Sequence, residues 1–325
     1  MSPRVLGVVV NPTADRGHAD RAGVRTLARL REHGHDVREL SGTSFDDALG
    51  RARAAVTHGL DALVVVGGDG MVHLGANACA GTATPLGIVA AGSGNDYARA
   101  LGLPLRDVDA AVRVLLGALD AGARVVDAAR VTSDDPAEEP RWFCGVLSAG
   151  LDAAVNARAN RMRRPRGRAR YAVAALQELA RFRPFGYRIT IESRTGTAAG
   201  PAPDAPVASV WDSPGTLVAV ANGPAIGGGI RIAPDALVDD GDLDLVLAGP
   251  LSRHGALRVF PLTYAGKHVG HPVVDVRRVV RVRLEPTDQG VPPPPAFADG
   301  ELIGPLPREV RVVPGALHVL APPAP

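Results

Sequence analysis

One short stretch limits the possible folds of this chain more than any other. Residues 61–66, Asp-Ala-Leu-Val-Val-Val, run directly into Gly67-Gly68-Asp69-Gly70. An uninterrupted apolar run of this length predicts a strand buried on both faces, which is typical of parallel sheets. The glycines that follow predict a tight turn at the carboxyl end of that strand. The stretch therefore indicates an open α/β sheet whose ligand-binding edge lies at this turn.

Similar patterns surround this stretch in the first third of the chain. The sequence predicts strands at 4–10, 37–40, 61–66 and 86–90, and helices at 19–33, 45–58, 71–80, 94–101 and 107–118. Alternation of strand and helix implies a parallel sheet with helices on both faces. We expect one doubly wound α/β domain over residues 1–128.

The rest of the chain, residues 129–325, has a different pattern. Its apolar segments are short and strand-like, and Gly, Pro and Asp turns separate them. The predicted strands cover 142–148, 186–193, 216–222, 242–248, 277–285 and 309–313. We expect a β-rich, sandwich-like second domain with a few helices and an irregular loop at 194–206. A C-terminal tail, about 314–325, is expected to pack back on the first domain.

Composition restricts the function classes. The 325 residues are 46% hydrophobic but only 4% aromatic, so Ala, Val and Leu must fill the cores. A net charge of +2 gives no reason to expect nucleic-acid binding. Cys79 and Cys144 form no metal-binding pair and are expected to be free thiols in a reducing compartment. No apolar run approaches a membrane span of roughly 18 residues, so we expect a cytoplasmic protein.

Three polar turns follow three of the predicted parallel strands. They are Asn11-Pro12-Thr13, Gly67–Gly70 and Gly92–Asp96. Carboxyl ends of parallel strands meet at one sheet edge, where glycines and helix N-termini bind phosphate. A carboxylate in such a loop would repel phosphate unless a metal lay between them, so Asp69 suggests Mg²⁺. Taken singly, each turn also fits an ordinary connection between strand and helix.

The motifs in these turns resemble those of a known family. V-V-N-P at 9–12, G-G-D-G at 67–70 and G-S-G-N-D at 92–96 are similar to the catalytic domain of diacylglycerol kinases, which sphingosine and ceramide kinases share. The soluble bacterial diacylglycerol kinases are the type that the chain resembles most. Segments resembling that family continue at 143–152 and 233–245, and Asp299-Gly300-Glu301 looks like its catalytic D-G-E.

The resemblance implies a function. ATP would lie in a cleft between the domains, and its γ-phosphate would pass to the hydroxyl of diacylglycerol or a similar lipid alcohol, giving phosphatidic acid. NAD kinases also carry G-G-D-G, so an NAD kinase-like enzyme is an alternative, although the late D-G-E favours lipid kinases. A non-catalytic nucleotide or lipid sensor is another alternative. It is suggested by Met71, where the family usually has Thr, and by His73-Leu74, where it has Asn-Glu.

The same resemblance assigns residues to nucleotide binding. The set expected to contact ATP consists of Asn11, Pro12, Thr13, Ser41, Gly67, Gly68, Asp69, Gly70, Met71, Val72, Gly92, Ser93 and Asn95. All of them except Ser41, Met71 and Val72 belong to the three turns, and Met71 and Val72 directly follow the second turn. Ser41 is included for its spacing from the glycine loop, and a surface turn fits it equally well.

Catalytic roles follow from what phosphoryl transfer requires, namely positioning, charge neutralisation and a base. Glu301 is the predicted base for the acceptor hydroxyl, and Asp299 is expected to orient the site. Asp69 and Asp96 are candidates for a Mg²⁺–water network at the phosphates, and Arg99 for neutralising transition-state charge. Asp127 is placed in the same acidic set by the resemblance alone.

A second magnesium ion is implied in the β-rich half. There the family holds a structural Mg²⁺ with two carbonyls and one carboxylate, which correspond to the Leu237 and Asp242 carbonyls and the Asp240 side chain. An ordinary Asp-Gly hairpin turn fits the same residues.

The charged residues suggest one more partner. Residues 158–170 contain seven arginines and no acid, and no aromatic residue interleaves them. We expect this stretch either to be a solvated loop or to bring the protein to an anionic membrane, where its lipid substrate lies. All nine histidines are expected to be solvent-exposed or packing residues. A sheet edge in the second domain could pair to form a homodimer.

Overall fold

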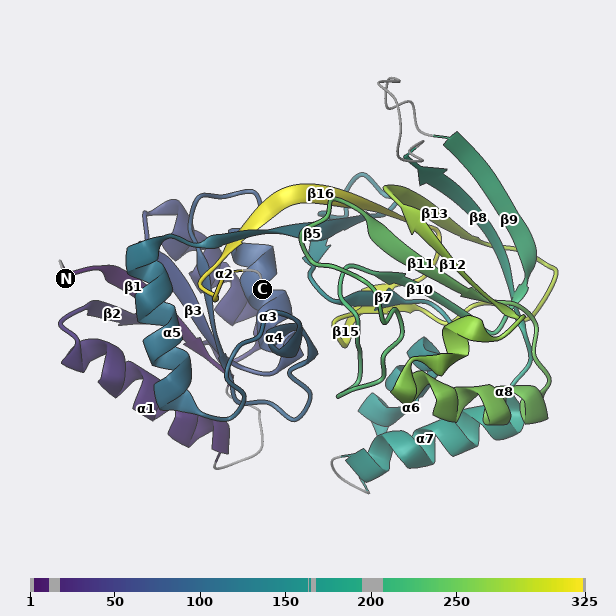
Figure 1. The fold of residues 1–325 in the computed structure, drawn as a ribbon, viewed down its shortest axis with the longest axis horizontal. Coiled ribbons are helices and arrows are strands. Elements are labelled where there is room, and N and C mark those ends of the chain that lie inside the picture. Colours follow the sequence, from purple (N-terminus) through teal and green to yellow (C-terminus); the bar gives the residue numbers. More distant parts are fainter. Residues whose placement is uncertain (1–2, 12–17, 163, 165–167, 195–206, 324–325) are drawn as a thin grey trace.

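The computed structural model describes residues 3–11, 18–162, 164, 168–194 and 207–323. The chain forms two lobes that lie side by side (Figure 1). The N-terminal lobe contains four parallel strands in the order β2-β1-β3-β4. These are β1 (Val5–Val10), β2 (Asp36–Glu39), β3 (Ala62–Gly67) and β4 (Leu86–Ala90). Every residue of β3 and β4 is buried, as their unbroken apolar sequences predict.

Helices cover both faces of this parallel sheet. They are α1 (His18–Glu32), α2 (Phe45–Thr57), α3 (Asp69–Cys79), α4 (Asp96–Ala100) and α5 (Val108–Ala121). Successive strand residues point to opposite faces. Leu63 and Val65 pack with α2 and α3, whereas Val64 and Val66 pack with α1 and α5. The doubly wound α/β architecture is therefore confirmed.

The second lobe is built from two sheets packed face to face. Its strands are β5 (Arg124–Thr132), β6 (Arg141–Phe143), β7 (Val146–Ser148), β8 (Phe185–Ser193), β9 (Val207–Gly215), β10 (Leu217–Ala221), β11 (Leu243–Ala248), β12 (Val274–Val279), β13 (Arg281–Pro286), β14 (Ala296–Ala298), β15 (Glu301–Gly304) and β16 (Arg308–Val319). One sheet runs β12-β11-β10-β7-β14-β15. Its inner residues share a core with β5, β8, β13 and β16, so the β-rich second half is confirmed.

Two long antiparallel strands join the lobes. β5 leads out of the parallel sheet and β16 returns to it, where Val319 pairs in parallel with Leu86 of β4 (Figure 1). The backbone N–H of Leu320 also donates to the Leu86 carbonyl at 2.9 Å. The C-terminal segment thus completes the edge of the first sheet. Residue 128, where the sequence suggested a boundary, lies inside β5 rather than in a linker.

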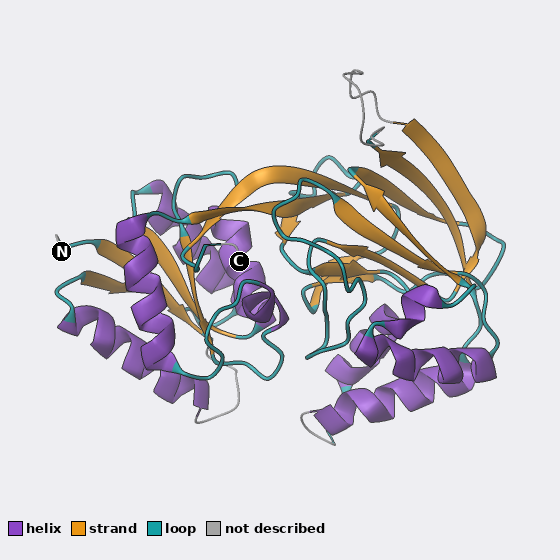
Figure 2. Cartoon of the chain, viewed as in Figure 1, coloured by secondary structure: helices purple, strands orange, loops and turns teal. Residues whose placement is uncertain are grey.

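Three helices lie together at one end of the second lobe (Figure 2). They are α6 (Leu151–Arg161), α7 (Arg168–Arg181) and α8 (Arg253–Val259), followed by the short 3-10 helices η1 (Phe260–Ala265) and η2 (Lys267–Gly270). The arginine-rich stretch therefore contributes to the end of α6 and the start of α7, not to one continuous loop. In the described parts of the chain, no helix is long and apolar enough to cross a membrane. Most of the loop expected at 194–206 lies outside the described residues.

Candidate active site

Two glycine-rich turns meet at the carboxyl edge of the parallel sheet. The Gly67 carbonyl accepts hydrogen bonds from the N–H groups of Ala91 (2.9 Å) and Gly92 (3.1 Å). The turns are so close that a Cβ atom at Gly92 would lie 2.3 Å from the Cα atom of Gly68. Only glycine fits there. Asn95, with φ of 61°, closes the second turn, because its side chain bonds both the N–H and the carbonyl of Gly92.

The end of the first strand lies beside these turns. The Asn11 N–H donates to the Val66 carbonyl at 3.2 Å, and the Ser41 hydroxyl accepts from the Val10 N–H at 3.1 Å. Ser41 therefore supports the end of β1. Pro12 and Thr13, the other predicted nucleotide contacts of this turn, lie outside the described residues. The three strand ends do meet at one edge, as a parallel sheet requires.

Two predicted nucleotide contacts are directed elsewhere. The side chains of Met71 and Val72 are buried in the core below the loop, and both backbone N–H groups donate to the Gly68 carbonyl. Met71 fills the space beside Gly67, where a Cβ atom would lie 2.5 Å from its Cγ. Met71 thus acts as a packing residue, and its difference from the family pattern changes the core rather than the phosphate-facing surface.

Asp69 and Asp96 lie next to each other at the start of α3 and α4. One Asp69 oxygen accepts the Tyr97 N–H at 3.2 Å, and the other would lie 2.6 Å from a Cβ atom at Gly94. Burial, together with the negative charge of Asp96, raises the pKa of Asp69 to about 6. Asp69 is half-buried and Asp96 is buried, and carboxylate oxygens side by side at a glycine-rich turn are a ligand type that suits Mg²⁺.

Asp96 is held by partners from both lobes. Its carboxylate accepts the Arg99 guanidinium at 2.7 Å and, from the second lobe, the Gly228 N–H at 2.6 Å. Arg99 also donates to the Gly94 carbonyl at 3.3 Å, and about half of its side chain is exposed. Gly228 has a φ of 83°, and the sequence analysis had assigned it no role. It connects the second lobe to the nucleotide side of the site.

The Asp299-Gly300 turn is held tightly from within the second lobe. Both residues have positive φ, 51° and 89°, and the buried Asp299 carboxylate accepts the N–H groups of Cys144 (3.1 Å) and Gly145 (2.8 Å). Its second contact is the Nδ1 atom of His73 on α3, 3.3 Å away. The general expectation for the histidines was therefore incomplete, since His73 joins the lobes through Asp299. These contacts also explain why the strand predicted at 142–148 is interrupted between β6 and β7.

Glu301, the next residue but one, is in a different situation. Its Oε1 atom would lie 2.6 Å from a Cβ atom at Gly70, so this carboxylate reaches across to the glycine loop. Within the described part of the chain, no hydrogen bond or ion pair engages it. On the other side, the Asn156 amide of α6 donates to the Gly300 carbonyl at 3.2 Å. The fold thus brings a free carboxylate to the phosphate loop, and glycine at residue 70 makes room for it.

Asp127 does not join this acidic group. It lies inside β5, where its carboxylate accepts the N–H groups of Gly241 (2.6 Å) and Gly315 (2.8 Å). Its own N–H donates to the Val238 carbonyl at 2.7 Å. The buried carboxylate therefore holds two backbone turns at the junction of the lobes. The sequence around Asp127 did not indicate this structural role.

The loop that resembles a structural magnesium site is paired with arginines. Arg278 bonds the carboxylate of Asp240 and lies 3.0 Å from that of Asp242, whose other oxygen is 3.4 Å from Arg194. An ion at Asp240 would compete with Arg278 for this carboxylate. Within the described ranges, no cluster of three or more His, Cys, Asp or Glu side chains could hold a metal.

Comparison with known proteins identifies the class. Residues 5–131 match the family described as the diacylglycerol kinase catalytic domain, and residues 145–321 match the YegS C-terminal NAD kinase beta sandwich-like domain. The fold and the site together define a kinase with an α/β nucleotide lobe and a β-sandwich lobe.

Individual relatives agree with this class. The chain is 39% identical over 314 residues to a diacylglycerol kinase of Mycobacterium tuberculosis (strain H37Rv), covering 97% of this chain and 94% of the relative. It is 22% identical over 318 residues to a diacylglycerol kinase of Bacillus subtilis (strain 168), covering 97% and 95%. A crystal structure of a diacylglycerol kinase from Bacillus anthracis matches the fold with a TM-score of 0.65 at 19% identity, covering 98% and 97%. The chain belongs to the diacylglycerol kinase family and is a lipid kinase.

Proposed function

We propose that this lipid kinase transfers the γ-phosphate of ATP to the hydroxyl of diacylglycerol or a similar lipid alcohol, so that diacylglycerol would give phosphatidic acid. The observation that carries the proposal is the position of Glu301. Its carboxylate lies against Gly70 of the phosphate loop without a partner among the described residues. A base in that position can take the proton of an acceptor hydroxyl while its oxygen bonds to phosphorus.

Each part of the site has a task in this proposal. The backbone of Asn11, Gly67–Gly70 and Gly92–Asn95 would hold the nucleotide phosphates at the sheet edge. Asp69 and Asp96 would hold Mg²⁺, which neutralises phosphate charge when bound. Arg99 would position Asp96, because its guanidinium is already bonded to that carboxylate. The acceptor oxygen then bonds to the γ-phosphorus, the bond from phosphorus to the bridging oxygen breaks, and ADP leaves.

Asp299 would act as a positioning residue rather than as a base. Its carboxylate is buried and already accepts two backbone N–H groups, so little of it remains for an acceptor hydroxyl. Because Asp299 holds the positive-φ turn, it fixes the direction in which the Glu301 side chain points from the start of β15. The proposal thus separates two carboxylates that the D-G-E motif places side by side.

A transfer assay with a panel of acceptors tests the proposal. The protein would be incubated with labelled ATP, Mg²⁺ and, separately, diacylglycerol, monoacylglycerol, a sphingoid base, ceramide and NAD. We expect label in a lipid product, with diacylglycerol among the acceptors. Label only in NADP would support the NAD kinase alternative. Transfer to no acceptor, with ATP binding retained, would support the non-catalytic sensor.

The helices α6, α7 and α8 support a peripheral membrane contact. Tyr171 and Leu176 on α7 and Leu257 on α8 are more than 40% exposed, and Arg161 and Arg164 at the end of α6 are also exposed. Arg158, by contrast, is paired with Glu178 and is not free for lipids. Exposed apolar side chains beside arginines are typical of a surface that meets anionic lipid. We propose that this end faces the bilayer.

Vesicle binding measures this contact. Each arginine near an anionic surface contributes about 1 kcal/mol, so Arg161→Gln together with Arg164→Gln should weaken binding roughly 30-fold. The vesicles would contain phosphatidylglycerol, and Arg31→Gln together with Arg113→Gln, at exposed positions on α1 and α5, is the control that removes the same net charge. Equal binding by both proteins would contradict the proposal.

The homodimer stays a prediction. β9 is an outer strand of the ten-stranded sheet, and Val210 on it is 60% exposed, so β9 is the edge that could pair. Light scattering during size-exclusion chromatography would measure the mass, and Val210→Lys should reduce it to that of one chain if this edge pairs.

A further inference from the structure

A row of arginines crosses the outer face of the ten-stranded sheet. Arg281 of β13 lies directly opposite Arg311 of β16, and Arg311 lies directly opposite Arg130 of β5. Flanking residues such as Val282 and Val310 are buried in the sandwich core, so the three arginines extend to the outside. Residues opposite each other on one face have Cβ atoms about 5 Å apart, and like charges at that spacing are destabilising.

Neighbouring charges on this face are compensated. Arg283 pairs with Asp134 at 2.7 Å, and Arg281 pairs with Glu192 (3.1 Å) and Glu309 (2.7 Å). Arg311 and Arg130 differ, because neither side chain makes a hydrogen bond or ion pair with any other described residue. Positive charge without a counter-charge is therefore concentrated where these two strands adjoin.

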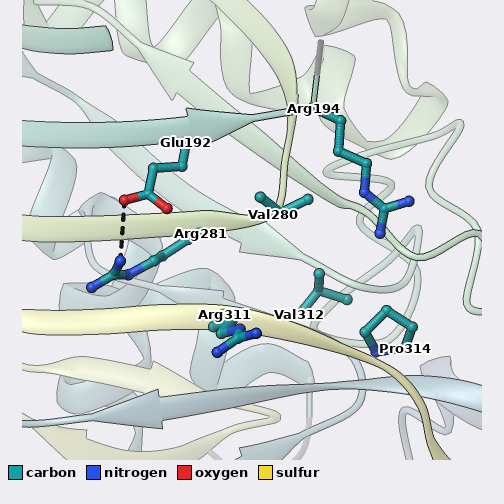
Figure 3. Close-up of a pocket in the computed structure, with 7 residues that line it drawn as sticks. All are labelled: Glu192, Arg194, Val280, Arg281, Arg311, Val312 and Pro314. Atoms are coloured by element: carbon teal, nitrogen blue, oxygen red, sulfur yellow. Dashed lines mark hydrogen bonds and ion pairs between the residues drawn. The ribbon is translucent and has the colours of Figure 1, made fainter. Parts of the chain in front are cut away.

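A hollow of about 440 Å³ opens at the end of this row. Figure 3 shows Arg281 and Arg311 on neighbouring strands, with Arg194 at the end of β8 on the far side of Val280 and Val312. Arg194 donates to the Gly241 carbonyl at 2.7 Å. The single carboxylate of the lining, Glu192, is bonded to Arg281. Arg194 also lies 3.4 Å from the Asp242 carboxylate, so Arg311 is the guanidinium of the lining that has no counter-charge in the described structure.

We propose that this hollow binds a phosphate group, at a site separate from the nucleotide turns. Guanidinium groups bind phosphate oxygens through paired N–H donors, and a phosphate would supply the missing counter-charge for Arg311, which lines the hollow. None of the lining residues belongs to the proposed nucleotide or catalytic set. The phosphate can come from a soluble phosphate ester or from the head group of an anionic phospholipid, since both present negatively charged, non-bridging phosphate oxygens.

Titration with inorganic phosphate tests the site. Wild type, Arg311→Gln and the control Arg113→Gln would be compared by isothermal titration calorimetry. Arg311 is exposed and unpaired in the described structure, so its loss should not lower the melting temperature. We expect Arg311→Gln to lose at least tenfold in affinity, and Arg113→Gln to bind like wild type. Phosphate bound at the glycine turns would give the same binding heat in all three proteins. A difference between wild type and Arg311→Gln therefore reports on the hollow alone, whether or not the proposed ATP site is correct.

Two vesicle arms then distinguish the sources of phosphate. Vesicles of phosphatidylcholine alone would be compared with vesicles that also contain phosphatidylglycerol. A loss of binding to the anionic vesicles in Arg311→Gln assigns the site to lipid head groups, whereas unchanged vesicle binding with lost phosphate affinity assigns it to soluble esters. Equal phosphate affinity in Arg311→Gln and wild type, or no phosphate binding by wild type, would overturn the proposal.

Discussion

Two acidic regions of this molecule look alike in sequence and differ in structure. At the junction of the lobes, Asp69 is bonded by backbone N–H groups and pairs with no arginine in the described structure, and Glu301 has no partner among the described residues. In the second lobe, Asp239, Asp240 and Asp242 each lie beside an arginine. The first region keeps negative charge available for ligands, and the second is neutralised by the chain itself.

The difference teaches how to separate a functional carboxylate from a structural one. Burial does not separate them, because Asp127 and Asp96 are buried and so is the side chain of Asp299. The partners do. Asp299 and Asp127 are occupied by backbone N–H groups that fix turns, whereas Asp69 carries a pKa raised to about 6 because burial and Asp96 disfavour its charge. An ionised carboxylate that destabilises the ligand-free protein is a candidate for ligand binding, because a bound cation can offset that cost in free energy.

The largest effect on stability is expected from Asp299→Ala. The change leaves two buried backbone N–H groups, those of Cys144 and Gly145, without acceptors. Each such group costs about 1–3 kcal/mol, so unfolding in urea should show a loss of about 3 kcal/mol together with loss of activity. Asp299→Asn, which keeps acceptor oxygen, should lose less. Wild-type stability in Asp299→Ala would mean that Asp299 does not hold the turn.

Gly70→Ala should reduce activity without changing stability. The new Cβ atom would lie 2.6 Å from Oε1 of Glu301, the flexible end of a side chain, which can move away at little cost to the fold. A displaced base of this kind should lower kcat roughly 100-fold. Gly50→Ala on α2, where nothing lies within 4 Å, is the matched control. Full activity in Gly70→Ala would mean that Glu301 does not act as the base in phosphate transfer.

Asp69→Asn should stabilise the ligand-free protein while removing activity. The pKa of about 6 lies above the usual 3.8, so the ionised carboxylate costs stability above pH 6 and costs nothing below pH 3.8. At pH 7 the gain should be on the order of 1–3 kcal/mol. Carboxyl NMR of the metal-free protein should show Asp69 titrating near pH 6, and at lower pH in Asp96→Asn. An Asp69 that titrates near 3.8 would contradict this.

The smallest effect is expected in the arginine-paired loop. Arg278 is about half exposed, so Arg278→Gln should cost no more than about 1 kcal/mol, and less at high salt. Because Arg278 occupies the Asp240 carboxylate, EDTA should leave the melting temperature of Asp69→Asn unchanged, a variant that lacks the proposed Mg²⁺ ligand at the glycine turns. A fall in the melting temperature of this variant with EDTA, reversed by Mg²⁺, would instead support a structural ion held by Asp240 and the carbonyls of Leu237 and Asp242.

Sequence reasoning succeeded where the signal is local. Buried apolar runs such as 62–66 and the glycines after them predicted the parallel sheet and the meeting of its turns, because periodicity and turn chemistry act over a few residues. It could not predict contacts between distant segments. The break between β6 and β7 depends on Asp299, 155 residues after Cys144. The burial of Met71 and the pairing of His73 with Asp299 likewise depend on how α3 packs in the fold, which the local sequence does not show.

Register is the other information that sequence reasoning lacked. Asp127 was placed in the catalytic set by resemblance, yet its position in β5 directs its carboxylate to Gly241 and Gly315. Arg130 and Arg311 are 181 positions apart in the sequence and oppose each other only because β5 and β16 pair in one register. The sequence analysis assigned these two arginines no role.

The account depends most on Glu301, and one measurement tests it directly. The rate of phosphate transfer from ATP to diacylglycerol would be compared in wild type and Glu301→Gln, with ATP binding and melting temperature as controls. General base catalysis contributes roughly 10²–10⁴-fold, so we expect a loss of that size with nucleotide affinity and stability unchanged. Transfer at the wild-type rate by Glu301→Gln would contradict the proposed mechanism.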